Sequence, residues 1–134
     1  MSAELSREEV LELLDRLERG EVRAAEPAGD GWKVNPEVKA GILRAFRLGV
    51  DVDLPAAPFA FRDRDTLLPR GTLPPGVRVV PGGSAIRRGA CVAKGVVVMP
   101  PAYVNVGAYV DEGSMVDSHA LVGSCAQIGK RVHL

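Results

Sequence analysis

The sequence predicts a mainly β protein, in which a small helical domain precedes a parallel β-helix that begins near residue 80. Two observations support this fold class. Aliphatic residues recur at every sixth position from Val80 to Leu134, and two amphipathic helical patterns lie within residues 1–50. A six-residue repeat is typical of a parallel β-helix, whose stacked coils bury a continuous core. Each hexad is expected to supply one short strand and one turn, and three hexads to close one triangular coil.

The repeat has a fixed chemistry at two of its six positions. The first position is always Val, Ile or Leu, and the fifth is always a small or short residue. A coil this narrow has room for a single branched side chain on each face of each layer, so we expect the first-position side chains to point inward. These residues are Val80, Ile86, Val92, Val98, Val104, Val110, Val116, Val122, Ile128 and Leu134.

Stacking of the coils makes two further predictions. Equivalent residues of successive coils should lie over one another and form one ladder of Val80, Val98, Val116 and Leu134. The glycines are expected where a turn needs backbone angles that other residues avoid. These glycines are Gly89, Gly95, Gly107, Gly113, Gly123 and Gly129.

Two helices are predicted in the helical N-terminal domain, residues 1–50. Ser6 followed by Glu9 is a capping-box pattern at the start of the first helix, and Gly20 is expected to end it. The second helix is expected to start after Asn35, its N-cap, with proline in the first turn, and to end at Gly49. A turn is expected between the helices.

Residues 51–79 are predicted to be a Pro-rich extended connector, because their prolines argue against a central strand. Residues 80–134 are then expected to form about three coils of β-helix. A β-helix that stops there leaves unpaired strand edges, which proteins normally cover. We therefore expect the sequence to be the N-terminal fragment of a longer, truncated protein; the alternative is a short gene product that pairs with another chain.

Composition narrows the function. A formal net charge of zero offers no electrostatic footprint for nucleic acid or a membrane surface. The acidic N-terminus lacks the basic start and apolar core of a secretion signal, so a cytoplasmic protein with two free cysteines is expected. A catalytic zinc needs three protein ligands, and the chain has only His119 and His133, so no metal site is predicted.

The segment VRVVPGGSAIRRGACVAKGVVVMPPAYVNVGAYVDEGSMVDSHALVGSCAQIGKRVHL resembles the tetrahydrodipicolinate N-succinyltransferases of lysine and diaminopimelate biosynthesis. The segments MPPAYVNVGAYVDEGSMVD and VGSCAQIGKRVHL are the ones most distinctive of this family. The resemblance extends back through GDGWKVNPEVKAGILRAFRL, which looks like the helical N-terminal domain of that family.

The resemblance implies a fold, an activity and an assembly. The family belongs to the hexapeptide-repeat acyltransferase superfamily, whose β-helices are left-handed. Its members are cytoplasmic homotrimers with active sites between neighbouring subunits. They transfer a succinyl group from succinyl-CoA, as co-substrate, to the amine of ring-opened tetrahydrodipicolinate, with no permanently bound cofactor.

Two residues match substrate-binding positions of the family. Asp117 matches the family's aspartate, and a carboxylate there is expected to anchor the acceptor's ammonium group, to take its proton as a catalytic residue, or both. Arg78 matches the family's arginine, whose guanidinium can pair with a carboxylate of the acceptor. His119 and His133 are expected to be structural. Contacts to CoA and a second carboxylate lie beyond residue 134 in the family, so this chain is expected to carry only part of an active site.

Two other functions stay open at this point. An N-acetyltransferase that acts on the same or a similar acceptor shares the β-helix, although not this helical front end. A non-catalytic β-helix assembly module would explain a short chain, but it leaves the matches at Arg78 and Asp117 as coincidences. A sugar nucleotidyltransferase would need a Gly-rich phosphate loop, which residues 1–50 do not contain.

Overall fold

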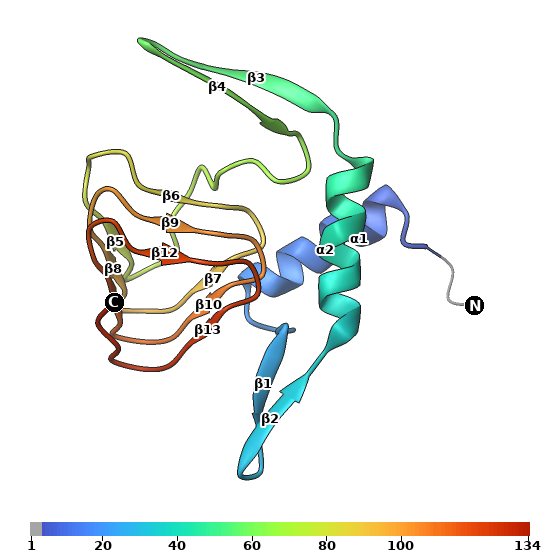
Figure 1. Cartoon of the computed structure of the whole chain (residues 1–134), viewed down its shortest axis with the longest axis vertical. Helices are drawn as coiled ribbons and strands as arrows, with labels where there is room; N and C mark the ends of the chain where they lie inside the picture. The colour runs from blue at the N-terminus through green and yellow to red at the C-terminus, as the bar shows by residue number, and fades with distance from the viewer. Residues whose placement is uncertain (1–3) are drawn as a thin grey trace.

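The computed structural model describes residues 4–134, in which two helices and two hairpins lie beside a stack of coils (Figure 1). The N-terminal elements are α1 (Arg7–Glu18), β1 (Ala25–Ala28), β2 (Gly31–Val34), α2 (Pro36–Leu48), β3 (Asp51–Ala56) and β4 (Phe59–Arg64). Nine two-residue strands follow: β5 (Arg78–Val79), β6 (Ala85–Ile86), β7 (Cys91–Val92), β8 (Val97–Val98), β9 (Tyr103–Val104), β10 (Tyr109–Val110), β11 (Met115–Val116), β12 (Leu121–Val122) and β13 (Gln127–Ile128).

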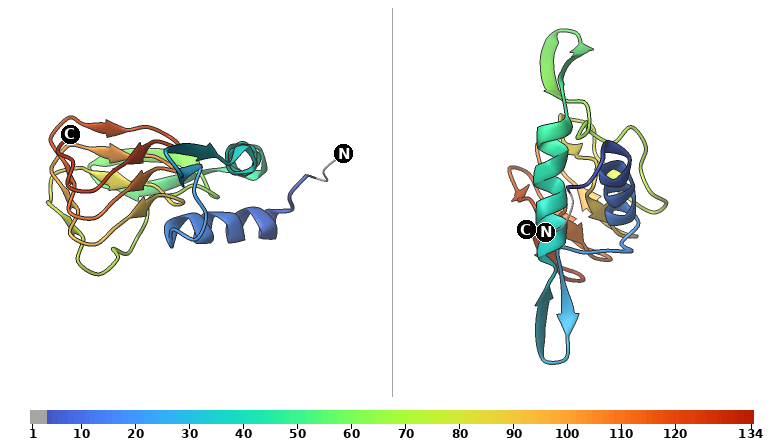
Figure 2. Two further views of the ribbon diagram at one scale, coloured as in Figure 1. Left: turned by 90° about the horizontal axis from the view of Figure 1, so that it is seen from below. Right: turned by 90° about the vertical axis from the view of Figure 1, so that its right-hand side faces the viewer.

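The nine short strands form the predicted parallel β-helix. They make three parallel sheets in the orders β5-β8-β11, β6-β9-β12 and β7-β10-β13, one for each face of the prism. Tyr109 pairs with Cys91 of the coil before it and with Gln127 of the coil after it, so equivalent hexads lie directly over one another. Figure 2 shows this stack from the side. The left-handed sense of the coil stays a prediction from the resemblance.

The interior of the prism is filled by the first-position aliphatic residues, as predicted. Val98, Val104, Val110 and Val116 are completely buried, and small fifth-position residues such as Ala90 pack with them. Small and branched aliphatic side chains, such as those of alanine and valine, fill the narrow cross-section without aromatic rings. This packing explains why a chain with only 4% aromatic residues can hold a core.

The first coil departs from the predicted register. Arg78 pairs with Val97 and Val79 with Val98, so Val79 starts the ladder and the prediction of Val80 was wrong. The loop to β6 is one residue longer than a hexad and contains two glycines with positive φ. Val80 matched the six-residue period by coincidence, because the regular repeat begins only at Ile86.

The turns also differ from the prediction. Positive φ values occur at one position of the hexad, at Gly89, Gly95, Gly107 and Gly113 and then at His119, Cys125 and Arg131, although Pro101 at the same position lacks one. Gly123 and Gly129 do not have positive φ, so their predicted role was wrong. Most turns place a left-handed residue at this position, and the later coils do so without glycine, at a cost of about 1 kcal/mol or more per residue.

Both predicted helices are present. Ser6 caps α1, and its Oγ accepts a hydrogen bond from the Glu9 amide at 3.2 Å. Asn35 occupies the N-cap position of α2, but its side chain does not cap the helix; Nδ2 donates instead to the carbonyl of Arg23 at 2.8 Å. Where only a turn was expected between the helices, β1 and β2 form an antiparallel hairpin that closes at Gly31.

A second hairpin, β3–β4, projects from the body of the molecule (Figures 1 and 2). The sequence predicted extended chain here but not its pairing. The hairpin has two strands and therefore no central strand, which is compatible with Pro55 within β3. Its base is anchored to the β-helix by Asp63, whose two oxygens accept hydrogen bonds from Arg87 at 2.8 and 2.9 Å.

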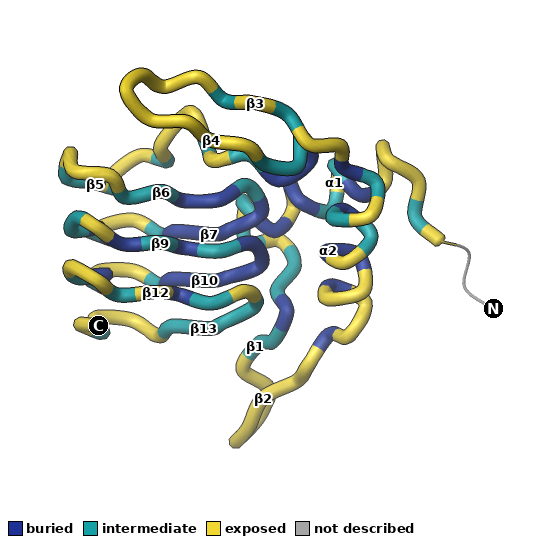
Figure 3. Tube along the Cα trace, turned by 45° about the horizontal axis from the view of Figure 1, so that its top comes forward, coloured by how far each residue is buried: buried dark blue, intermediate teal, exposed yellow. Residues whose placement is uncertain are grey.

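The helices pack on one corner of the prism and form a second core with it (Figure 3). Val106 belongs to this core, together with Leu14 of α1 and Ile42 of α2. A Cβ atom at Gly89 would lie 2.8 Å from Leu14, and one at Gly107 would lie 2.7 Å from Ile42. Glycine at this corner therefore lets the helices approach the coil.

Candidate functional site

Asp117 lies on the outer surface of the β-helix, directly after β11. Its neighbour Val116 is completely buried in the prism, and because side chains alternate along a strand, Asp117 points outward. Its side chain is 43% exposed. Oδ1 accepts a hydrogen bond from the Ser118 amide at 2.8 Å, a contact within the turn that fixes the orientation of the carboxylate.

His133 supplies a second contact to this carboxylate. Its Nε2 lies 2.8 Å from Oδ2 of Asp117 and serves as the donor, because an ionised carboxylate can only accept. His133 reaches Asp117 because it forms a parallel bridge with Met115, one coil earlier. The imidazole is 65% exposed and open to a ligand on its other side.

Sequence reasoning did not pair His133 with Asp117. It was expected to be structural, and the structure adds its hydrogen bond to Asp117, so its role stays a prediction. The signal that could have found the pair is spacing, since His133 follows Asp117 by 16 residues, close to the three hexads that close one coil. Residues with this separation lie on neighbouring coils and on the same face.

The pair lowers the pKa of the Asp117 carboxyl below its usual value. The hydrogen bond from His133 is the largest cause, the Ser118 amide comes next, and the charge of a protonated His133 acts in the same direction. Partial desolvation opposes these effects but is weaker than the hydrogen bond from His133. Asp117 is therefore ionised at neutral pH and able to hold a cation or accept a proton.

Arg78 lies on the same sheet as Asp117, in the first strand, β5. It pairs with Val97 of β8, which in turn pairs with Met115 of β11, so two strand spacings, roughly 10 Å along the axis, separate Arg78 from the level of Asp117. The Arg78 side chain is exposed. The structure therefore places the two predicted residues on one outer face but does not bring them into contact.

Other polar residues of the distinctive segment have local roles. The amide of His119 donates to the carbonyl of Pro101 at 2.6 Å. His119 is exposed and occupies a left-handed turn position. Oδ1 of Asp111 accepts a hydrogen bond from the Glu112 amide at 2.7 Å, which stabilises the turn. Cys125 packs against the helical core as a small residue.

Within residues 4–134, no cluster of three His, Cys, Asp or Glu side chains has the arrangement of a metal site. The helices of the same residues are all too short or too polar to cross a membrane. The Asp117–His133 pair and the exposed guanidinium of Arg78 are the candidate site that the following proposals use.

A β-helix with a six-residue repeat, joined to a small helical domain, defines the structural class of the protein. Within that class, residues 2–48 match the family model described as the N-terminal domain of tetrahydrodipicolinate N-succinyltransferase. The predicted resemblance to this family is therefore confirmed for the helical part of the chain.

Curated relatives carry the same name, 2,3,4,5-tetrahydropyridine-2,6-dicarboxylate N-succinyltransferase. The protein of Methylorubrum extorquens is 44% identical over 52 residues, which are 39% of this chain and 19% of the relative. That of Nitrobacter hamburgensis is 47% identical over 53 residues, again 39% and 19%. That of Afipia carboxidovorans is 46% identical over 46 residues, 34% of this chain and 16% of the relative. The matched segment thus spans less than a fifth of the length of these relatives.

Proposed function

We propose that this protein is an N-succinyltransferase that transfers the succinyl group of succinyl-CoA to the amine of tetrahydrodipicolinate, in lysine and diaminopimelate biosynthesis. The observation that carries the proposal is the match of residues 2–48 to the N-terminal domain of that family. The β-helix follows this domain after the β3–β4 hairpin and presents Asp117 and Arg78 on one outer face.

The chemistry requires an ionised carboxylate near the acceptor. The acceptor's amine is an ammonium ion at neutral pH and must lose a proton before its nitrogen can attack the thioester carbon. The C–N bond then forms, the C–S bond breaks, and the CoA thiolate leaves and takes up a proton. Asp117 is the proposed anchor for the ammonium group, because its lowered pKa keeps it ionised, and its position beside the amine makes it the proposed acceptor of the proton.

Arg78 is the proposed partner of an acceptor carboxylate. Tetrahydrodipicolinate is a dicarboxylate, and a planar guanidinium can hold a carboxylate with two parallel hydrogen bonds. The exposure of Arg78 leaves its donors open to such a ligand. Succinyl-CoA enters this proposal as a co-substrate, and the proposal needs neither a permanently bound cofactor, a metal nor a nucleic acid.

We place the active site between subunits of a cytoplasmic homotrimer. Two observations support this assembly. Arg78 and Asp117 point outward and do not meet within one chain, which is compatible with a cleft that a neighbouring subunit closes around the acceptor. The hairpin β3–β4 also exposes Phe59 and Phe61, which are 66% and 54% exposed and find no cover within residues 4–134.

The test is an assay of thiol release from acyl-CoA by the full-length gene product. With tetrahydrodipicolinate as acceptor, we expect succinyl-CoA to support turnover at least tenfold faster than acetyl-CoA, because discrimination of this order needs only about 1.4 kcal/mol. A preference for acetyl-CoA would favour the N-acetyltransferase. Absence of turnover with both donors would favour the non-catalytic assembly module.

A further inference from the structure

We propose that His133 is a positioning residue that holds the carboxylate of Asp117 in the orientation needed to receive the acceptor's ammonium group. This inference rests on the proposed function, since it assigns Asp117 to the acceptor. It adds a residue that the resemblance did not assign to the site. It also explains why an exposed imidazole lies 2.8 Å from an exposed carboxylate one coil away.

The backbone around His133 is held firmly against the preceding coil. The Val132 amide donates to Oγ of Ser114 at 3.0 Å, and the Leu134 amide donates to the carbonyl of Met115 at 3.0 Å. In return, the Met115 amide donates to the carbonyl of Val132 at 2.8 Å. With hydrogen bonds on both sides of it, His133 has a fixed position relative to β11, and the coil geometry sets the direction of its side chain.

The contact with His133 leaves part of the carboxylate free. Oδ1 of Asp117 is held by the Ser118 amide and Oδ2 by the imidazole, so the side chain has a donor on each oxygen. A carboxylate can accept about four hydrogen bonds, and about two positions therefore remain for an ammonium group. A side chain fixed in this way does not lose rotamer freedom when the acceptor binds, which is the advantage of a preorganised site.

Few other groups act on this carboxylate. Among the side chains of the described residues, only that of His133 shifts the pKa of Asp117. On the preceding coil, Met99 and Pro101 lie at the corresponding positions and carry no charge. On its own turn, Asp117 is followed by Ser118, which contributes a backbone amide, and by His119, which exerts no such shift. A change in the titration of Asp117 can therefore be traced to His133.

The experiment compares His133→Ala and His133→Gln with the control His119→Asn in the full-length protein. Asparagine tolerates the left-handed backbone of position 119, so the control removes the other imidazole without disturbing the turn. The first readout is the ¹³C titration of the Asp117 carboxyl, assigned with Asp117→Asn. The second is kcat and KM for the acceptor.

We expect the pKa of Asp117 to rise in His133→Ala, because a donor and a positive charge are lost, and to stay unchanged in His119→Asn. We expect kcat/KM to fall roughly tenfold to a hundredfold in His133→Ala. His133→Gln retains an N–H donor and should recover part of this loss. A merely structural role would lower stability in both variants without the recovery or the shift in titration.

Each contrary outcome is distinct. An unchanged Asp117 titration in His133→Ala would overturn the pairing. A shifted titration with unchanged kcat and KM would overturn the positioning role. The titration needs no substrate, so it still tests the pair if the wild-type protein turns over neither acyl donor, a result that would contradict the proposed function instead.

Discussion

Asp117 and Val116 are adjacent residues of one hexad with different roles, one in a candidate site and one in the core. Val116 is buried and fills the prism, whereas Asp117 faces outward and its carboxylate is fixed by Ser118 and His133. The six-residue period demands an aliphatic residue at the first position but no acid at the second. An acid there, held by two donors, is available for the proposed acceptor.

Replacing Asp117 with Asn should remove the proton acceptor while retaining the shape of the side chain. We expect kcat/KM to fall by about 10²- to 10⁴-fold, the usual worth of a general base. The lowered pKa means that Asp117 stays ionised as the pH falls below neutral and is protonated only as the pH passes through its folded pKa, which lies below the usual value of an aspartate. Protonation of Asp117 should therefore not lower kcat/KM as the pH falls slightly below neutral.

The matched control for this variant is Asp111→Asn, which changes an acid at the same hexad position one turn earlier. Its carboxylate bonds only the neighbouring turn amide of Glu112, so activity should stay within about twofold. Steady-state rates across pH 5–9, about neutrality, measure both variants. Equal losses in the two variants would show that any turn acid affects the rate, and would remove Asp117 from the site.

Arg78 should act on binding more than on the rate of transfer. Arg78→Ala is expected to raise KM for the acceptor roughly tenfold to a hundredfold, the loss of one charge-assisted pair of hydrogen bonds. Arg78→Lys should recover little of the affinity, because an ammonium cannot form the two-pronged contact. The control is Arg62→Ala, which removes an exposed arginine whose partner is Asp53 on the hairpin. An unchanged KM in Arg78→Ala would contradict the assignment.

At the scale of elements, the corner of the prism that carries Gly89, Gly107 and Cys125 is the docking surface for the helices. Asp15 of α1 pairs with Arg88 at 3.0 Å beside this corner, and the Gly89 amide donates to Glu18 at 3.0 Å. The same left-handed turn position is occupied by larger residues on other corners, such as His119. Glycine at this corner serves packing as well as backbone angle.

Gly107→Ala should therefore destabilise the protein for two reasons. The new Cβ would lie 2.7 Å from Ile42 and 3.0 Å from Sγ of Cys125, and φ is +78°. Overpacking and the unfavourable φ together should lower the free energy of unfolding by roughly 2–4 kcal/mol. Gly123→Ala is the control, because its Cβ would meet nothing within 4 Å. Urea denaturation of both variants measures the difference, and equal midpoints would contradict this account of the corner.

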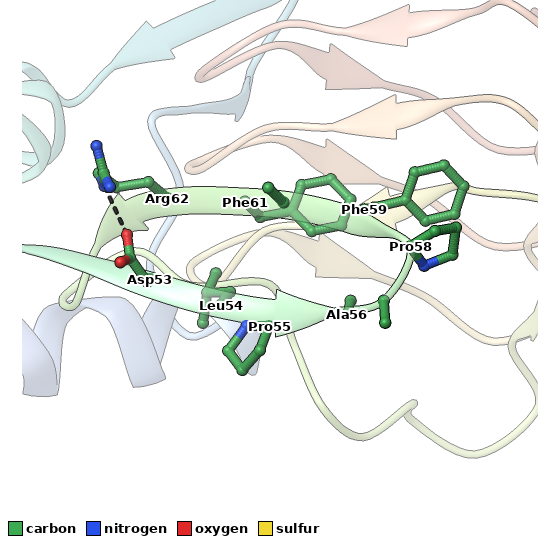
Figure 4. A pocket seen from close by; sticks show the side chains of 10 residues that line it. Asp53, Leu54, Pro55, Ala56, Pro58, Phe59, Phe61 and Arg62 are labelled. Atoms are coloured by element: carbon green, nitrogen blue, oxygen red, sulfur yellow. Dashed lines mark hydrogen bonds and ion pairs between the residues drawn. The ribbon is translucent and has the colours of Figure 1, made fainter.

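The hairpin β3–β4 is an element with two unlike faces (Figure 4). Directly opposed residues of an antiparallel pair share a face. Leu54 opposes Phe61 on one face, and the rings of Phe59 and Phe61 lie 6.2 Å apart between centroids. Asp53 and Arg62 form an ion pair at 2.6 Å on the other face. The hairpin thus exposes an apolar strip and a charged strip on opposite sides.

For the whole molecule, this apolar strip predicts an effect on assembly. If the protein is a trimer whose subunits cover the hairpin, the double variant Phe59→Ser, Phe61→Ser should shift it toward monomer, because burying each ring contributes about 1.5–3 kcal/mol. Ala60→Ser, on the charged face, is the control and should not change the mass. Sedimentation equilibrium measures the mass of each. A double variant that remains trimeric would place the hairpin outside the interface, and a monomeric wild type would contradict the trimer.

The sequence alone determined the parallel β-helix, its buried ladder from Ile86 to Val122, and both N-terminal helices, whereas Leu134, predicted to point inward, is exposed. These features follow from side-chain spacing along the chain, because a narrow prism and an amphipathic helix each bury residues at a constant interval. The hairpins could be predicted only in part from the sequence. Pro55 argues against a central strand at its position, but it does not indicate which strands pair. Asp117 and Arg78 came from the resemblance, and their roles stay predictions.

Three features were decided by the tertiary structure alone. They are the start of the ladder at Val79, the corner with Gly89 and Gly107 on which the helices pack, and the hydrogen bond between Asp117 and His133. Each depends on how one coil closes onto the next. A single extra residue in the first loop changes which valine points inward, and a turn without glycine keeps its left-handed backbone when the neighbouring coils hold it. The Asp117–His133 contact arises because closure of a coil brings a residue one full turn away to hydrogen-bonding distance, and spacing along the chain does not encode the direction of either side chain.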